Sequence, residues 1–297
     1  MNAKPVKRKR KRTPKPPWLK ANIPAGENYF KIKKNLESRD LSTICQRARC
    51  PNISECWNNF HATFLIMGDT CSRDCSFCSV KGGKPTPLFP GEADRVVEMV
   101  DIMKAKYVVI TSVTRDDLAD GGSGHFAGVI TKLKTHRPQV KIEVLIPDFK
   151  GNTQHLDTVL DAKPDVLNHN LETVRRLYPH VNRMMENYRV SLEVLRYGHE
   201  RGFVTKSGIM VGLGETREEI TGLFQDQGQS GVDLLTIGQY LQPTKENVPV
   251  EKYYTPEEFD ELKELALSCG FTAVESGVFV RSSYKAQRMY EMTRQGV

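Results

Sequence analysis

Residues 64–78 read FLIMGDTCSRDCSFC, an apolar run followed directly by Cys71, Cys75 and Cys78 in the spacing CxxxCxxC. The run 64–67 predicts a buried strand, and the cysteines predict a ligand loop at its end. Three thiolates on one loop can bind a cubane iron–sulfur cluster, and because such a cluster has four irons, one iron stays free for another ligand. Zinc is the alternative, but structural zinc usually takes four protein ligands in two separated CxxC pairs, a pattern that this chain lacks.

A second group of three cysteines precedes this loop. Cys45, Cys50 and Cys56 follow the spacing CxxxxCxxxxxC in a polar, aperiodic segment. Three buried core cysteines are the alternative interpretation, but the polarity of the segment favours metal ligation. Six of the seven cysteines lie within residues 45–78, in a chain too large to need disulfides, which favours metal binding in a reducing cytoplasm.

Two further residues carry metal-binding atoms in a less favourable setting. His61 lies between the two cysteine groups, and we predict a structural role for it because better thiolate ligands surround it. Cys269 stands at the end of a predicted helix, just before Gly270, and we predict that it is a core residue.

From residue 64 onward, short β-rich runs alternate with amphipathic helical patterns. A capped helix is predicted to begin after Thr255 and to stop at Gly270. About six strand–helix units in a row predict an α/β fold with a parallel sheet, either barrel-like or doubly wound. The strand candidates are residues 64–67, 107–112, 142–146, 166–168, 207–211 and 234–237, followed by 272–274 and 278–280.

Polar and glycine-rich segments follow these predicted strands. In a parallel barrel the carboxyl ends of the strands meet at one face, so we expect the segments to lie together there. Gly212 and Gly214 alone are a weak signal, because they form no GxGxxG fingerprint and also suit turns. The segments are residues 68–78, 114–124, 147–149, 168–172, 212–216 and 239–243.

The formal net charge of +7 over 297 residues is concentrated at the N-terminus. Residues 1–20 contain nine lysines and arginines and no acidic residue, so the remaining chain is close to neutral. This proline-rich basic tail is predicted to be disordered, because it has few apolar residues to bury. A nucleic-acid or nuclear signal and a transit peptide are alternative interpretations of the tail. We expect no secretory signal, because the N-terminus has no apolar h-region, and no membrane span, because no apolar run of about 18 residues exists.

The cysteine loop resembles the CxxxCxφC signature of the radical S-adenosylmethionine superfamily, with Phe77 as the aromatic residue φ. The resemblance implies a partial (β/α)6 TIM-like barrel of the radical SAM type with N- and C-terminal extensions. It also implies that the cluster passes one electron to S-adenosyl-L-methionine, releasing methionine and a 5′-deoxyadenosyl radical that abstracts hydrogen from carbon. The corresponding division is a basic tail (1–20), an extension with the second cysteine group (21–62), the barrel (63–270) and a C-terminal segment (271–297).

A serine motif near the end of the chain, RSSY at residues 281–284, narrows this resemblance. With the two cysteine groups in this order, the chain resembles the lipoyl synthase family. The resemblance implies that the second cysteine group holds an auxiliary 4Fe-4S cluster whose fourth ligand is a serine of the motif. Spacing alone does not choose between Ser282 and Ser283, and we predict Ser283. Because a hard serine oxygen replaces a soft thiolate on iron, this ligand should be the labile one.

The same resemblance implies a reaction and its partners. Two sulfur atoms would enter carbons 6 and 8 of an octanoyl chain carried on a lysine of a lipoyl-carrier domain or H protein, with the auxiliary cluster as sulfur donor. Two hydrogen abstractions require two molecules of S-adenosyl-L-methionine and an external electron donor, typically ferredoxin or flavodoxin. An iron–sulfur carrier would rebuild the consumed cluster.

Further residues receive roles by analogy with the superfamily. Loop capping and salt bridging are the alternative for each, because polar residues at helix starts often have that role. The carboxylates and the amide would hold the methionine moiety or the ribose, the aromatic ring and the glycine backbone would line the adenine, and the arginine would contact a carboxylate. The residues are Asp116, Asp117, Asn170, Glu172, Phe77, Gly212, Gly214 and Arg183.

Three other functions compete with this interpretation. A methylthiotransferase would be expected to carry an RNA-binding appendage, and the serine motif argues against both that enzyme and a sulfur inserter of the biotin synthase type. A zinc-dependent nucleic-acid binder that uses the basic tail is the alternative from a different class. Counts of iron and sulfide per chain distinguish this zinc protein from a protein with two iron–sulfur clusters.

Overall fold

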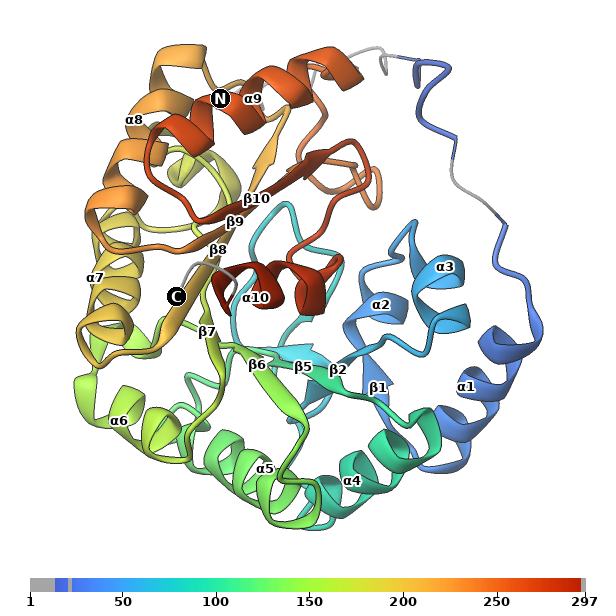
Figure 1. Ribbon diagram of the computed structural model, residues 1–297. Coiled ribbons are helices and arrows are strands. Elements are labelled where there is room, and N and C mark those ends of the chain that lie inside the picture. Colours follow the sequence, from blue (N-terminus) through green and yellow to red (C-terminus); the bar gives the residue numbers. More distant parts are fainter. Residues whose placement is uncertain (1–13, 21–22, 295–297) are drawn as a thin grey trace, which may run out of the picture.

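The computed structural model describes residues 14–20 and 23–294 and is built around one eight-stranded sheet (Figure 1). Along the sheet the order is β1-β2-β5-β6-β7-β8-β9-β10, and every neighbouring pair is parallel except β1 and β2. Two short strands, β3 and β4, pair separately. The strands are β1 Ser42–Thr43, β2 Thr63–Ile66, β3 Thr70–Cys71, β4 Lys81–Gly82, β5 Tyr107–Ser112, β6 Lys141–Leu145, β7 Val166–Asn168, β8 Val204–Val211, β9 Leu234–Gln239 and β10 Ala273–Gly277.

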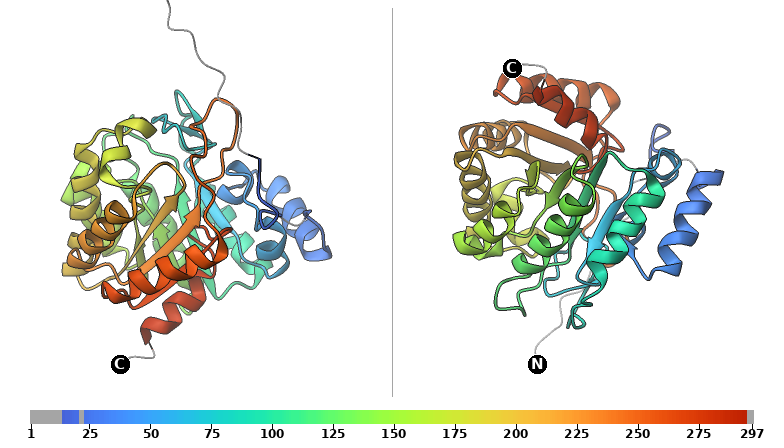
Figure 2. Two further views of the ribbon diagram at one scale, coloured as in Figure 1. Left: turned by 90° about the horizontal axis from the view of Figure 1, so that it is seen from above. Right: turned by 60° about the horizontal axis from the view of Figure 1, so that its bottom comes forward.

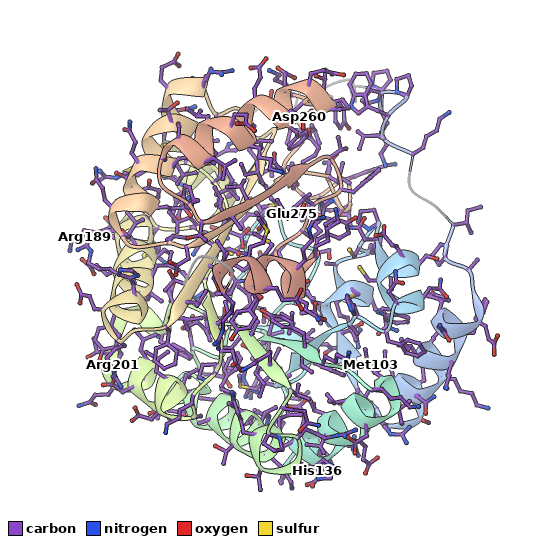
Figure 3. All side chains as sticks on the ribbon, viewed as in Figure 1. Met103, His136, Arg189, Arg201, Asp260 and Glu275 are labelled. Carbon is purple, nitrogen blue, oxygen red and sulfur yellow. The ribbon has the colours of Figure 1, made fainter. Side chains whose placement is uncertain are left out.

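Helices α4 to α9 form a ring outside the curved sheet, as Figure 1 shows. Their apolar faces pack on the strands, and charged side chains such as Arg189 and Arg201 point outward (Figure 3). The first three helices lie beside β1 and β2 at the edge of the ring. The helices are α1 Glu27–Ser38, α2 Ile44–Arg47, α3 Ile53–Asn58, α4 Glu92–Met103, α5 Ser123–His136, α6 Thr153–Asp161, α7 Glu186–Glu200, α8 Arg217–Gln229, α9 Pro256–Ser268 and α10 Ala286–Arg294, with the 3₁₀ turns η1 Phe149–Gly151, η2 Arg175–Leu177 and η3 Pro179–Val181.

The last helix, α10, covers the end of the sheet where the strands begin (Figures 1 and 2). Tyr290 packs on Tyr107 at the start of β5, with ring centroids 5.8 Å apart, and on Val166 at the start of β7. Met289 packs on Leu234 at the start of β9. One end of the barrel is therefore closed by α10, and the carboxyl ends of the strands form the opposite face.

The predicted fold class is confirmed: the chain is an α/β protein with a parallel sheet curved into a partial barrel. The six predicted units correspond to β2 and β5 to β9, and β10 adds a seventh parallel strand. The predicted helix cap is also confirmed, because the Thr255 hydroxyl accepts from the Glu258 N–H at 3.3 Å.

One predicted strand, residues 278–280, is wrong. β10 continues to Gly277, which pairs with Gly238 of β9, and the chain then turns, with the Val280 N–H donating to the Gly277 carbonyl at 3.0 Å. The apolar run Val278 to Val280 resembles a strand, but the turn takes it out of the ladder with β9. We call residues 278–285 the strap, because they cross from β10 to α10.

Part of the predicted basic tail, residues 1–13, lies outside the described residues. The Trp18 indole donates to the Tyr254 carbonyl at 3.2 Å, so this part of the chain contacts the loop before α9. Among the described residues, no helix combines the length and the apolarity needed to cross a membrane. The predicted division into four segments stays a prediction.

Candidate functional site

The cysteine loop, residues 71–78, leaves the carboxyl end of β2 and is fixed by hydrogen bonds to its backbone. The Ser72 N–H and hydroxyl both donate to the Thr114 carbonyl at 3.0 Å, which ties the loop to the end of β5. From the far side, the Asn247 amide donates to the carbonyls of Ser76 and Cys78 at 3.0 and 2.9 Å. These contacts orient the loop from both sides.

An arginine inside the cysteine loop anchors it to two further strand ends. Arg73 donates to both carboxylate oxygens of Asp116, at 2.7 and 3.1 Å, and to both of Asp148, at 2.6 and 2.7 Å. The Asp148 side chain is buried, and the guanidinium holds the pKa of Asp148 well below its ordinary value despite the burial. The pKa of Asp116 is lowered by the same partner. This double fork fixes the loop geometrically as well as electrostatically.

The thiols of the cysteine loop are largely buried and lie near backbone N–H donors. Burial raises the pKa of Cys75 to about 11 and that of Cys78 to about 12, and the neighbouring thiols add to both shifts. Backbone N–H groups of Arg73 and Val80 donate to the sulfurs of Cys71 and Cys78 at 3.4 Å. A bound metal cation would reverse the effect of burial, because coordination deprotonates a thiol.

A carboxylate and an arginine lie beside these thiols. The charges of Glu172 and Arg183 act on the thiol of Cys75 in opposite directions, so both groups are its neighbours. Burial raises the pKa of Glu172 above its ordinary value, although Arg183 and a hydrogen bond from Asn170 favour the carboxylate. Glu172 has φ of 70° and bridges to Ile209, so β8 holds its backbone in a strained conformation next to the cysteine loop.

The remaining sequence-predicted cofactor residues have partners of their own. Asp117 pairs with Arg115 at 2.8 Å, and Asp116 pairs with Arg73. The N–H of Gly212 donates to Glu215, while the carbonyl of Gly214 accepts from Arg176 at 2.8 Å. The ring of Phe77 is partly buried against the apolar cluster between β8, β9 and their helices. These residues surround the face that bears the cysteine loop, and their cofactor roles stay predictions.

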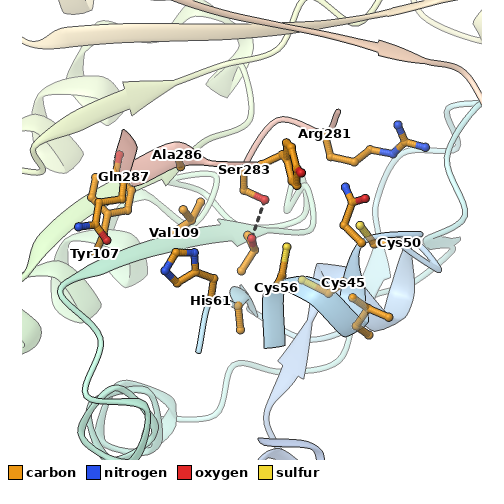
Figure 4. A pocket seen from close by; sticks show the side chains of 15 residues that line it. Cys45, Cys50, Cys56, His61, Tyr107, Val109, Arg281, Ser283, Ala286 and Gln287 are labelled. Carbon is orange, nitrogen blue, oxygen red and sulfur yellow. Dashed lines mark hydrogen bonds between the residues drawn. The ribbon is translucent and has the colours of Figure 1, made fainter. Parts of the chain in front are cut away.

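The second cysteine group lies in another pocket, between α2, α3 and the strap (Figure 4). We call it the serine pocket, because Ser283 of the strap faces Cys45, Cys50 and Cys56 across it. The Thr63 hydroxyl donates to the Ser283 hydroxyl at 2.7 Å. Four potential ligands from three separate segments thus line one pocket.

Burial and hydrogen-bond donors dominate the electrostatics of the serine pocket. Burial raises the pKa of Cys45 to about 11 and that of Cys56 to about 12, and the thiols reinforce one another. Burial also raises the pKa of Cys50, against the effects of the Asn52 N–H and the charge of Arg281. The buried Trp57 indole N–H has no hydrogen-bond partner, and its influence on Cys45 opposes the rise of the pKa that burial causes.

Both thiol groups fit iron–sulfur clusters by their donor chemistry. All six cysteines are free, and in each group donors or a cation face the sulfurs, as sulfur ligands of such clusters require. The unpartnered indole N–H at Cys45 is satisfied once a thiolate or cluster sulfur accepts from it. Within the described ranges 14–20 and 23–294, no three Cys, His, Asp or Glu side chains form a group that could hold one metal ion.

The two serines of the motif point to different places. Ser283 lies in the serine pocket, whereas the Ser282 hydroxyl accepts from Asn168 at 3.0 Å and donates to Asn170 at 2.9 Å. His61 also lines the serine pocket, and burial lowers its pKa. Cys269 follows α9 and packs, half-buried, on the apolar cluster there, as predicted for a core residue.

Sequence reasoning missed several residues that shape both sites. Arg73 stands inside the quoted motif, so its charge was a visible signal. Arg281 stands beside the predicted serines, and its position in the serine pocket could have been suspected from the motif. Thr63, Trp57 and Asn247 gave no signal, because their roles depend on contacts between distant segments.

Comparison with known proteins identifies the family of the chain. Residues 65–226 match the family model of the radical SAM superfamily, and residues 1–50 match the N-terminal domain of lipoyl synthase. The lipoyl synthase of Rubrobacter xylanophilus is 50% identical over 294 residues, which cover 98% of this chain and 91% of the relative. That of Parabacteroides distasonis is 50% identical over 92% of this chain and 97% of its own length.

Solved structures support the fold. The crystal structure of methylornithine synthase matches 89% of this chain and 92% of its own, with a TM-score of 0.54 at 14% sequence identity. At this identity the likeness concerns the barrel alone. The two near-full-length relatives decide the family. The chain belongs to the lipoyl synthase family of the radical S-adenosylmethionine superfamily.

Proposed function

We propose that this chain inserts two sulfur atoms, at carbons 6 and 8, into an octanoyl chain carried on a lysine of an acceptor protein. The observation that carries the proposal is the presence of two separate cysteine groups, one on the loop after β2 and one closed by Ser283 of the strap. Half of all residues are identical to curated lipoyl synthases over nearly the whole chain, which supports the same reaction.

The proposed ligands are divided between the two sites. Cys71, Cys75 and Cys78 would hold the radical 4Fe-4S cluster, which would bind S-adenosyl-L-methionine. The auxiliary 4Fe-4S cluster is held by the four ligands of the serine pocket: Cys45, Cys50, Cys56 and Ser283. When bound, the first cluster and its cofactor supply the radical chemistry and the second supplies the sulfur.

The chain's own residues position these groups. We assign Asn170, Glu172 and Arg183 to the amino and carboxylate groups of S-adenosyl-L-methionine, because charges of each sign from Glu172 and Arg183 act on Cys75 and the Asn170 amide donates to Glu172. Phe77, with Gly212 and Gly214, is assigned to the adenine. Asp116 and Asp117 are engaged by arginines, so we assign them the task of fixing the site around the cofactor.

The proposed reaction also requires partner proteins. The acceptor is a lipoyl-carrier domain or an H protein bearing octanoyl-lysine. A ferredoxin or flavodoxin supplies electrons, and an iron–sulfur carrier replaces the auxiliary cluster after turnover. All of these meet in the cytoplasm, where the thiols stay reduced.

The test is anaerobic incubation of the iron-loaded protein with an octanoyl-lysine peptide, S-adenosyl-L-methionine and reductant. We expect a product whose mass shows two added sulfur atoms, and iron and sulfide counts near two 4Fe-4S clusters per chain, one for each cysteine group. A protein that carries a single cluster, or one that cleaves the cofactor without adding sulfur, would contradict the proposal. A colourless, zinc-loaded protein would favour the nucleic-acid binder instead.

A further inference from the structure

The strap crosses the barrel between the two cysteine sites and is held by contacts on both sides. The amide of Asn52 in the serine pocket donates to the Phe279 carbonyl at 2.6 Å, and the Tyr284 hydroxyl donates to Glu55 of α3 at 3.1 Å. On the barrel side, the Val280 carbonyl packs directly on Gly238 of β9, where an added Cβ would lie 2.2 Å from it. A small shift of the strap should therefore change the geometry of the serine pocket.

Ser282 is the point where the strap joins the polar interior of the barrel. The Asn168 amide donates to the Ser282 hydroxyl at 3.0 Å and to Glu143 at 2.7 Å. Glu143 is fully buried, and it also accepts from Lys206 at 3.1 Å and from Tyr107 at 2.7 Å. This buried network fixes Asn168, since every contact lies inside the sheet.

From Ser282 a directed chain of hydrogen bonds runs to Glu172, whose charge acts on the thiol of Cys75. The Ser282 hydroxyl donates to Asn170 Oδ1 at 2.9 Å, and the Asn170 amide donates to Glu172 at 3.2 Å. Gly208 of β8 makes room for this arrangement, because an added Cβ would lie 2.8 Å from Asn170 Oδ1. Each group donates toward Glu172, so the bonds polarise one another in one direction.

The next residue, Ser283, faces the opposite way and receives the hydrogen bond from Thr63 in the serine pocket. Two adjacent serines thus form hydrogen bonds at two different sites. We propose that Ser282 is a positioning residue that sets Ser283 in the serine pocket and Asn170 against Glu172 at the same time. It couples the geometry of the two sites without touching a reacting atom, and this inference rests on the proposed function.

The test compares Ser282→Ala with Ser282→Thr in the full-length, iron-loaded protein. Losing one hydroxyl that bridges two amides should raise the amount of 5′-deoxyadenosine released per lipoyl group formed by about fivefold, the equivalent of one hydrogen bond. The electron paramagnetic resonance spectrum of the auxiliary cluster should change in the same variant. Ser282→Thr keeps the hydroxyl and should restore both toward the wild type.

The matched control is Ser276→Ala in β10, which loses a hydroxyl bond of 2.7 Å to the Phe259 carbonyl, away from both sites. Ser276→Ala should lower the stability of the protein as Ser282→Ala does. It should leave unchanged the ratio of 5′-deoxyadenosine to lipoyl groups and the spectrum of the auxiliary cluster. If Ser282→Ala behaves like this control, the serine is merely structural and the inference is wrong.

A second variant keeps the test open if Ser282→Ala does not fold. Gly208→Ala crowds Asn170 Oδ1, the atom that accepts from Ser282, together with the Thr236 hydroxyl, and should produce the same uncoupling; an unchanged ratio would contradict the inference. The proposed function fails separately, if the wild-type protein adds no sulfur. In that case the cluster spectra of the serine variants still decide whether Ser282 couples the sites.

Discussion

The two cysteine sites are built in contrasting ways. The cysteine loop is one short segment, and Arg73, Ser72 and backbone bonds fix it to the ends of neighbouring strands. The serine pocket is assembled from α2, α3 and β2 together with the strap. The strap lies more than two hundred positions further along the chain than the other three elements. The geometry of the first site depends on local sequence and on the sheet. The geometry of the second site depends on how the strap packs against α2, α3 and β2. This difference predicts which changes damage one site and spare the other.

Cysteine replacements should give the largest effect and separate the sites completely. Cys75→Ala should stop cleavage of S-adenosyl-L-methionine and sulfur insertion together, because the radical cluster loses a ligand. Cys50→Ala should abolish sulfur insertion and leave cofactor cleavage measurable. The readouts are 5′-deoxyadenosine and product mass. Equal loss of both activities in the two variants would contradict the division of labour.

Removing the arginine of the cysteine loop should cost the most stability. Arg73→Met leaves the Asp148 carboxylate, whose side chain is 1% exposed, without its cation and should destabilise the protein by about 3 kcal/mol. Denaturant unfolding measures the loss. Asp148→Asn in the same background removes the stranded charge and should recover part of the stability; no recovery would show that the ion pair is not the cause.

The same pair predicts a pH dependence. The folded-state pKa of Asp148 is depressed, so its contribution is present above its unfolded pKa of about 4 and is lost as the pH falls toward the folded-state value. Thermal unfolding between pH 3 and pH 7 should show a steeper acid loss in the wild type than in Arg73→Met. Parallel curves would refute this assignment.

Crowding the strap should damage the serine pocket selectively. Gly238→Ala places a Cβ 2.2 Å from the Val280 backbone, so the strap must shift, at a cost of about 2 kcal/mol. We expect less auxiliary iron and a normal radical cluster, measured by iron content and by Mössbauer spectra. Gly222→Ala in α8, where an added Cβ meets open space, is the matched control and should stabilise by about 0.5–1 kcal/mol.

The smallest expected effect concerns the hydrogen bond to Ser283. Thr63→Val removes the hydroxyl that donates to Ser283 at 2.7 Å and keeps the shape of the side chain. The free energy of unfolding should fall by about 1 kcal/mol, and the cysteine loop should keep its cofactor cleavage rate. A slower cleavage rate in this variant would mean that the two sites are less separable than their construction indicates.

The sequence predicted the parts of the molecule that depend on neighbouring residues. Alternating strand and helix patterns gave the parallel sheet, and the capping pattern at Thr255 gave the start of α9. The prediction of a strand at 278–280 is wrong, because an apolar run such as Val278 to Val280 occurs both in strands and in turns that leave a sheet. Local periodicity cannot report that no neighbouring strand is available there.

For the sites, the sequence by itself determined the candidate ligands: six cysteines in two spacings and a pair of serines. Only the tertiary structure decided that Ser283 faces the serine pocket while Ser282 joins Asn168 and Asn170. Spacing along the chain sets which donors exist, but the direction of adjacent side chains depends on how the strap crosses the barrel. Packing against Gly238, together with hydrogen bonds from distant strands, fixes that crossing.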